Sequence, residues 1–261
     1  MQTPPVSMPQ ASPRELVPRR APSEDVWETL RARDLEEKMG QGTAHGEATI
    51  LFVDVTEVLL SGQERTAHLG WDVFVEWDPN DPRARVSPDV FLLDGQPASI
   101  APSIWQTWLP GCDPPRFVLE IVSERSRAKD YETSPLKYAA LGTEELVIFD
   151  AKPRGEEAFA LQIFQRTARG QFLRVYAGPG PVESTVLRAW LVVTDSGARV
   201  RLARDAEARD LVPTRKEQAQ AATQQAQAAT QQAQAATARA ETAEAEVRRL
   251  RDELARLGAK G

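Results

Sequence analysis

Hydrophobic positions spaced three and four residues apart predict two helices near the start of the chain. The first is expected over residues 23–39, with Ser23 as its N-cap. The second is expected over residues 45–60 and should end at Ser61-Gly62. The residues of this second helix that should face the core are Ile50, Leu51, Val53, Val58 and Leu60.

Runs rich in β-branched and aromatic residues predict a series of strands after residue 70. The expected strands are 71–77, 86–93, 116–122, 145–149, 159–165 and 172–176, with 186–193 as a further candidate. The turn at 78–82 would let the first two pair as a hairpin. A short helix is predicted from Ser134, its cap, to Leu141, with Pro135 in the first turn and Gly142 as its end. This order predicts an α/β fold, a mixed sheet flanked by helices.

A long proline-containing segment, residues 95–115, separates two of the predicted strands and contains Trp105 and Trp108. Loops of this length often carry function, and exposed tryptophans can stack on nucleic-acid bases. The simpler interpretation is that both indoles pack the loop onto the core, and we favour it.

The composition changes after Pro213, where a seven-residue Ala- and Gln-rich unit begins to repeat. With Ala219 at position a of a heptad, one frame runs from there to Leu257 and predicts a coiled-coil helix. The a and d positions are Ala219, Ala222, Ala226, Ala229, Ala233, Ala236, Ala240, Ala243, Val247, Leu250, Leu254 and Leu257. Homo-oligomerisation through this helix is expected, and whether the helices pair parallel or antiparallel is left open. A lone, marginally stable helix is the alternative.

The chain is 261 residues long, and its composition suggests one globular domain with non-globular flanks. We expect a flexible, proline-rich lead-in over 1–22, a folded domain over 23–212 and the coiled coil over 213–261. No apolar run approaches the about 20 residues that span a bilayer, so no membrane segment is expected. The single cysteine, Cys112, excludes an internal disulfide framework, and a cytoplasmic protein is the simplest interpretation.

Two acidic residues in apolar surroundings are the strongest chemical signal. Asp89 precedes the run Val90-Phe91-Leu92-Leu93, and Glu120 lies within 117–122. Buried carboxylates that converge repel each other unless a cation neutralises them, and Mg²⁺ or Mn²⁺ would do so. The carbonyl of Ile121 would be a third metal ligand, and Lys137 would orient water and counter the charge of a phosphate. Taken singly, these residues are better explained as a turn, a salt-bridge partner and a solvated lysine; together, in the order strand, loop and helix, they favour the metal site.

The order of these pieces resembles the Uma-two family of restriction-endonuclease-like proteins in the PD-(D/E)XK nuclease superfamily. The matching pieces are Pro88-Asp89-Val90 and the stretches 118–123, 137–142 and 145–150, within a resemblance over residues 40–195. The resemblance implies a restriction-endonuclease-like fold, Asp89 and Glu120 as metal ligands, and a family position at His45.

The usual lysine two residues after the glutamate is replaced by Val122, and the resemblance implies that Lys137 takes its role, with Asp130 assisting. The sequence Ser123-Glu124-Arg125-Ser126 and the insertion 95–115 depart from the family pattern.

The remaining candidates have ordinary explanations. Cys112 has no evident histidine partner, and two histidines, His45 and His68, cannot form a multi-histidine metal site. Glu47 and Glu57 are either extra acids or part of a solvated face. The basic run 125–129 is either a phosphate contact or a solvated loop.

Two functions remain open from the sequence. The first is a metal-dependent endonuclease that hydrolyses phosphodiester bonds in DNA. The second is an inactive nuclease-fold scaffold that its coiled coil assembles. The net charge of −6 counts mildly against DNA as the substrate.

Overall fold

The computed structural model describes residues 14–15, 43–155 and 159–258. The chain divides into two compact units, Met1–Val212 and Pro213–Gly261. The helix predicted over 23–39 lies outside the described residues. Within the segment predicted to be a flexible lead-in, Arg14–Glu15 instead form a short strand, β1, which pairs with β10 (Phe172–Gly178).

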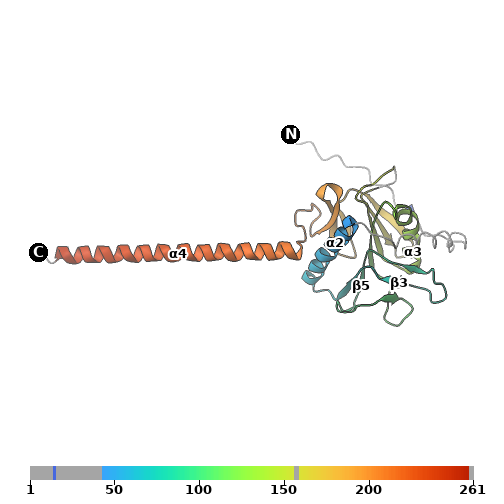
Figure 1. Ribbon diagram of the computed structural model, residues 1–261, viewed down its shortest axis with the longest axis horizontal. Coiled ribbons are helices and arrows are strands. Elements are labelled where there is room, and N and C mark those ends of the chain that lie inside the picture. Colours follow the sequence, from blue (N-terminus) through green and yellow to red (C-terminus); the bar gives the residue numbers. More distant parts are fainter. Residues whose placement is uncertain (1–13, 16–42, 156–158, 259–261) are drawn as a thin grey trace. The chain divides into compact units, whose positions relative to one another are not determined.

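A mixed sheet is the centre of the first unit (Figure 1), as the sequence predicted. Among the described residues it has seven strands in the order β1-β10-β9-β8-β7-β5-β2. Only the pair β7 and β8 is parallel; the other neighbours are antiparallel. The bounds not yet given are β2 (Ala67–Gly70), β5 (Val90–Asp94), β7 (Phe117–Ile121), β8 (Glu145–Phe149) and β9 (Leu161–Arg166).

Both faces of the central strands are buried, which is why β7 and β8 read as continuous apolar runs. Phe117, Leu119 and Ile121 belong to one core cluster, which includes α2 (Thr43–Gly62). Val118 belongs to the other, which includes α3 (Ser134–Leu141). The two helices therefore cover opposite faces of the sheet (Figure 1).

Helix α2 confirms the predicted helix, but one residue that was predicted to face the core is exposed. Ala48, Phe52, Val55 and Leu59 recur at spacings of three and four and are buried, whereas Ile50 is 70% exposed. Ile50 lies two residues from Ala48 and Phe52, which places it on the opposite side of the helix. The prediction that Ile50 faces the core is therefore wrong.

The predicted strand 86–93 is two strands, not one. It is interrupted at 87–89 and divides into β4 (Arg85–Val86) and β5, because Pro88 has no N–H to donate to a ladder. The predicted hairpin is formed by β3 (Phe74–Glu76) and β4, which pair antiparallel. Strand β5 pairs instead with β2, which the sequence did not predict, and with β7.

The long loop 95–115 contains a short strand, β6 (Ile104–Gln106), parallel to β3. Trp105 is buried, and its indole N–H donates to the carbonyl of Asp113 at 2.9 Å. Packing of the loop onto the core is therefore confirmed for Trp105.

A second small sheet follows the central one in the chain, in the order β11-β12-β13. Its strands are β11 (Val182–Ser184), β12 (Ala189–Thr194) and β13 (Arg199–Ala203), with a 3₁₀ turn, η2 (Asp195–Gly197), between the last two. Of these strands, only β12 overlaps a predicted strand, 186–193. Helix α2 contacts β13, so this sheet closes the core on that face.

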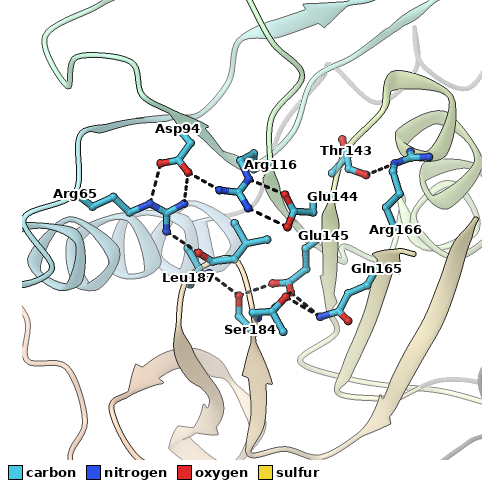
Figure 2. A network of polar contacts seen from close by, with 12 residues as sticks. Arg65, Asp94, Arg116, Thr143, Glu144, Glu145, Gln165, Arg166, Ser184 and Leu187 are labelled. Atoms are coloured by element: carbon cyan, nitrogen blue, oxygen red, sulfur yellow. Dashed lines mark hydrogen bonds and ion pairs between the residues drawn. The ribbon is translucent and has the colours of Figure 1, made fainter. Parts of the chain in front are cut away.

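An ion-pair network fixes the ends of β5 and β7 that lie away from the candidate acids (Figure 2). Arg65 donates to both oxygens of Asp94, at 2.8 and 2.9 Å, and to the carbonyl of Val186 at 2.6 Å. Arg116 donates to Asp94 at 2.6 Å and to both oxygens of Glu144, at 2.6 and 2.9 Å. The loop before β12 is thereby anchored to the central sheet.

The second unit is one helix, α4 (Arg215–Gly258), of 44 residues. It begins with a capping box, in which Thr214 Oγ1 accepts from Glu217 N at 3.1 Å and Glu217 Oε2 accepts from Thr214 N at 2.7 Å. No helix in the described part of the chain is long and apolar enough to cross a membrane.

Candidate active site

Asp89 lies in the bend just before β5, and Glu120 lies on the neighbouring strand β7. Val90 pairs with Leu119 across β5 and β7, so the same antiparallel register brings Asp89 opposite Glu120. The alternation along β7 places Glu120 on the face that α3 covers. The charges of Asp89 and Glu120 both act on His45, Tyr138 and Asp130, so the two carboxyls lie close together.

Both oxygens of Asp89 are held by the protein. Oδ1 lies 2.9 Å from His45 Nε2, and Oδ2 accepts from the backbone N–H of Ile121 at 2.7 Å. Burial alone would lower the pKa of His45. The hydrogen bond to Asp89 and the charges of Asp89 and Glu120 outweigh it, so this pKa is raised above 6.5. His45, at the start of α2, is thus part of the site.

Glu120 is buried, and its partner is a residue that sequence reasoning missed. Tyr138, on α3, donates its hydroxyl to Glu120 Oε1 at 2.6 Å and is itself fully buried. Burial, followed by the charge of Glu120, raises the pKa of Tyr138 well above its ordinary value. The only sequence signal was an aromatic residue on the helix that follows the glutamate strand.

A π-helical turn, η1 (Lys129–Thr133), runs directly into α3 and adds Asp130 to the cluster. Such turns are frequent at functional sites. Because η1 continues into α3, Ser134 has helical dihedrals and is not the N-cap that the sequence predicted. Gly142 does end α3, in the left-handed conformation, as predicted.

Asp130 is a buried carboxyl with one oxygen that lacks a hydrogen bond. The residue is 1% exposed, Oδ2 accepts from Ser126 Oγ at 2.5 Å, and Oδ1 has no hydrogen-bond partner. Burial and the negative charge of Glu120 raise the pKa of Asp130 well above 3.8; Lys129 and Ser126 oppose this, and Asp89 adds to it. Asp89, Glu120 and Asp130 therefore interact electrostatically as one cluster.

A second lysine, which the sequence did not single out as catalytic, lies beside this cluster. Lys129 Nζ lies 3.8 Å from Asp130 Oδ1. Lys137 is buried on α3, and its Nζ donates to the carbonyl of Arg85 at 3.3 Å. Lys137 directly precedes Tyr138, so the two side chains leave the helix about 100° apart. When Tyr138 points to Glu120, Lys137 points toward Arg85.

The donor atoms suit a hard divalent cation. Mg²⁺ in proteins is bound through one or two carboxylates and keeps several waters. Oxygens of Asp89 and Glu120 would meet that need, with Asp130 beside them. Oδ1 of Asp130 has no hydrogen bond and lies 3.8 Å from the ammonium of Lys129, so this buried oxygen already faces one cation. Within the described ranges, no group of three or more His, Cys, Asp or Glu side chains is arranged to hold a metal by itself. The cluster therefore fits Mg²⁺ or Mn²⁺ with water ligands and does not fit a structural zinc site.

The other candidates lie in ordinary surroundings. The ring of His68 packs edge-on against Phe91. Glu47 is exposed on α2, and Cys112 is half-buried. Within the basic run 125–129, Arg127 forms an ion pair with the buried carboxylate of Asp150.

A family with the description "Uma2: Putative restriction endonuclease" matches residues 23–194. No curated protein matches the chain. A solved structure described as a putative nuclease belonging to DUF820, from Anabaena variabilis, is similar at 15% sequence identity, with a TM-score of 0.39, over 57% of this chain and 75% of that chain.

The family match covers well over half of the chain and includes Asp89, Glu120, Asp130 and Lys137. The chain belongs to the Uma2 family of restriction-endonuclease-like proteins.

Proposed function

We propose that this protein is a nuclease that depends on Mg²⁺ or Mn²⁺ and hydrolyses phosphodiester bonds in DNA, with Asp89 and Glu120 as the metal ligands. The observation that carries the proposal is the register that sets Asp89 opposite Glu120 beside the buried Asp130. A protein gains nothing in stability from gathering three carboxyls in one buried place, because their charges repel. A site for a divalent cation accounts for this arrangement.

The groups around the acids have positioning roles. The N–H of Ile121 and the ring of His45 fix the orientation of Asp89, and the hydroxyl of Tyr138 fixes that of Glu120. We expect Asp130 to offer its Oδ1 as a further oxygen ligand, and the Ile121 carbonyl to complete the set. The cation would activate water and stabilise the charge that develops on the phosphate.

Two lysines are candidates for the cationic group that orients the water and contacts the phosphate. Lys137 is the candidate from the sequence, and Lys129 is the candidate from its place near Asp130. Comparison of Lys129→Met with Lys137→Met in a cleavage assay distinguishes them. The variant that removes the catalytic ammonium should lose activity with metal binding retained.

The decisive experiment measures metal binding and cleavage in the full chain. Calorimetric titration with Mn²⁺ should show binding that Asp89→Asn and Glu120→Gln each abolish. Plasmid DNA should be cut with Mg²⁺, not with EDTA, and not by either variant; single-stranded DNA and RNA serve as parallel substrates. Glu124→Gln is the matched control, because it removes an exposed carboxylate four residues from Glu120 that pairs with Arg154.

A second function is favoured by two features, the net charge of −6 and the sequence Ser123-Glu124-Arg125-Ser126, which departs from the family pattern. An inactive nuclease-fold scaffold would retain the sheet and the coiled coil without cleavage. Wild-type protein that folds, binds no Mn²⁺ and cuts no nucleic acid would support the scaffold and refute the nuclease.

A further inference from the structure

We propose that α4 is a self-association surface, and that two copies of this chain pair through a parallel, in-register coiled coil over residues 219–257. The proposal is independent of the nuclease function. It commits to one partner, a second copy of the same helix, and it assigns the strand order that the heptad pattern alone leaves open.

The helix presents an apolar seam to solvent. All described side chains along α4 are exposed, and Val247 and Leu250 are each 47% exposed, among the larger apolar side chains left open in the molecule. Isolated helices in water are stabilised only weakly by their own propensity, and most helical stability in proteins comes from packing of an apolar face. A 44-residue helix of this kind therefore needs a partner along its seam.

The seam has the spacing of a two-stranded coil. In the frame that starts with Ala219 at position a, Val247 falls at a and Leu250 at d. A β-branched residue at a with leucine at d favours two parallel strands. The alanine layers before them allow close approach and bury little area, so the segment 247–257 supplies most of the association energy.

Charges beside the seam select the parallel order. In a parallel pair, each g residue meets the e residue of the following heptad on the other helix. That rule brings Arg239 at g to Glu244 at e, and Glu246 at g to Arg251 at e. Both pairs are attractive, and each occurs twice in a symmetric dimer.

The antiparallel order lacks this match. There, g residues meet g residues and e residues meet e residues. An antiparallel pair that overlaps only at the Val- and Leu-containing ends sets Glu246 against Glu253, which repel, and Glu244 against Arg251, which attract, so its charges give no net gain. A full antiparallel overlap instead sets Val247 and Leu250 against alanines near the start of the helix. Within one chain Glu246 forms an ion pair with Arg249 at 2.7 Å, but both side chains are exposed and such pairs are weak, so it does not prevent exchange with Arg251 of a second copy.

The register follows from the four large layers. Only the in-register parallel alignment places Val247, Leu250, Leu254 and Leu257 each opposite its own copy. A shift by one heptad replaces two of these layers with contacts to alanine or to the end of the helix. The first residues of both copies of α4 then lie at the same end of a rod about 66 Å long.

The mass of the full chain tests the association. Sedimentation equilibrium of wild-type protein should give twice the chain mass, and Leu250→Asp should give the monomer. Ala245→Asp is the matched control, because position 245 is f and faces away from the seam; it adds the same charge and should leave the dimer intact. A monomeric wild type, a trimer or tetramer, or a dimeric Leu250→Asp would overturn the proposal.

Disulfide trapping tests the strand order. In a Cys112→Ser background, Ala222→Cys at a d position near the start of α4 should form a linked dimer readily under mild oxidation, and Gln224→Cys at f should not. A dimer in which Ala222→Cys fails to link would refute the parallel order.

Arg239→Glu should weaken the dimer at low salt, and the added change Glu244→Arg should restore it. Equal weakening by the single and the double variant would refute the charge pairing.

Discussion

The backbone N–H of Ile121 donates to Asp89 Oδ2 at 2.7 Å, so the carboxylate that precedes one strand is held against the residue that follows Glu120 on the next. This contact exists because β5 and β7 are antiparallel neighbours in the register Val90 with Leu119. It fixes the orientation of Asp89 in the protein as described. In the metal site proposed above, such pre-orientation would lower the cost of assembling the ligands.

Tyr138→Phe should lower the free energy of unfolding by about 2 kcal/mol, because the hydroxyl donates to a buried carboxylate. The ring and its packing are retained. Tyr176→Phe is the matched control: its hydroxyl accepts from the N–H of Gly180 at 2.8 Å, a neutral pair whose loss should cost about 1 kcal/mol. Urea denaturation in EDTA measures both. Equal losses would show that the acceptor at Glu120 is not a charged group.

Asp130→Asn should stabilise the metal-free protein and weaken Mn²⁺ binding. Asparagine still accepts from Ser126, and it removes a charge that burial and Glu120 disfavour. Asp150→Asn is the contrasting variant, because Asp150 is a buried acid paired with Arg127 and Tyr131, and its neutralisation should destabilise the fold. Urea denaturation in EDTA and Mn²⁺ calorimetry give the two readouts. A destabilised Asp130→Asn with unchanged Mn²⁺ affinity would make Asp130 a structural residue only.

Gly70→Ala should destabilise the protein by about 1–3 kcal/mol through overpacking. A Cβ at Gly70 would lie within 2.3–2.9 Å of ring atoms of Phe91, which is fully buried opposite it on β5. Gly46→Ala is the control: nothing lies within 4 Å of a Cβ there, and alanine in α2 should stabilise by about 1 kcal/mol. Thermal unfolding followed by circular dichroism compares them. A tolerated Gly70→Ala would mean that β2 and β5 are not packed as described.

Stability should fall as the pH drops from about 4 to about 2, with Asp94 as one cause. The hydrogen bond from Arg65, with further help from Arg116, lowers the pKa of Asp94 from 3.8 to about 2 despite partial burial. Because the folded-state pKa lies below the unfolded one, the stabilisation is complete above pH 4 and is lost as the carboxyl is protonated. Asp94→Asn should be less stable at pH 6 and should lose less on acidification. Parallel pH dependence of the two proteins would contradict this role.

The sequence identified elements whose signals are local. Strand β8 has the predicted bounds, Gly142 ends α3, and the helix predicted over 45–60 is α2 with two extra residues at each end. These features depend on hydrophobic periodicity and on the ability of glycine to adopt a positive φ. Both signals come from residues that are neighbours along the chain. Strands β2 and β13 were missed because they are short, and their pairing with distant strands stabilises them more than their composition does.

The residues of the site divide in the same way, into those that the sequence indicates and those that only tertiary packing identifies. The order of residues was enough to single out Asp89 and Glu120, since acids in buried strands conflict with their surroundings in any fold. The partners Tyr138 and Asp130, the position of Lys129 and the direction of Lys137 depend on the strand register and on the rotation that η1 imposes on α3. One residue along a helix turns a side chain by about 100°, so which residue of α3 meets Glu120 was decided only when helix and sheet packed together. The heptad frame of α4, by contrast, was complete in the sequence, because a helix needs no tertiary contact to keep its a and d positions on one side.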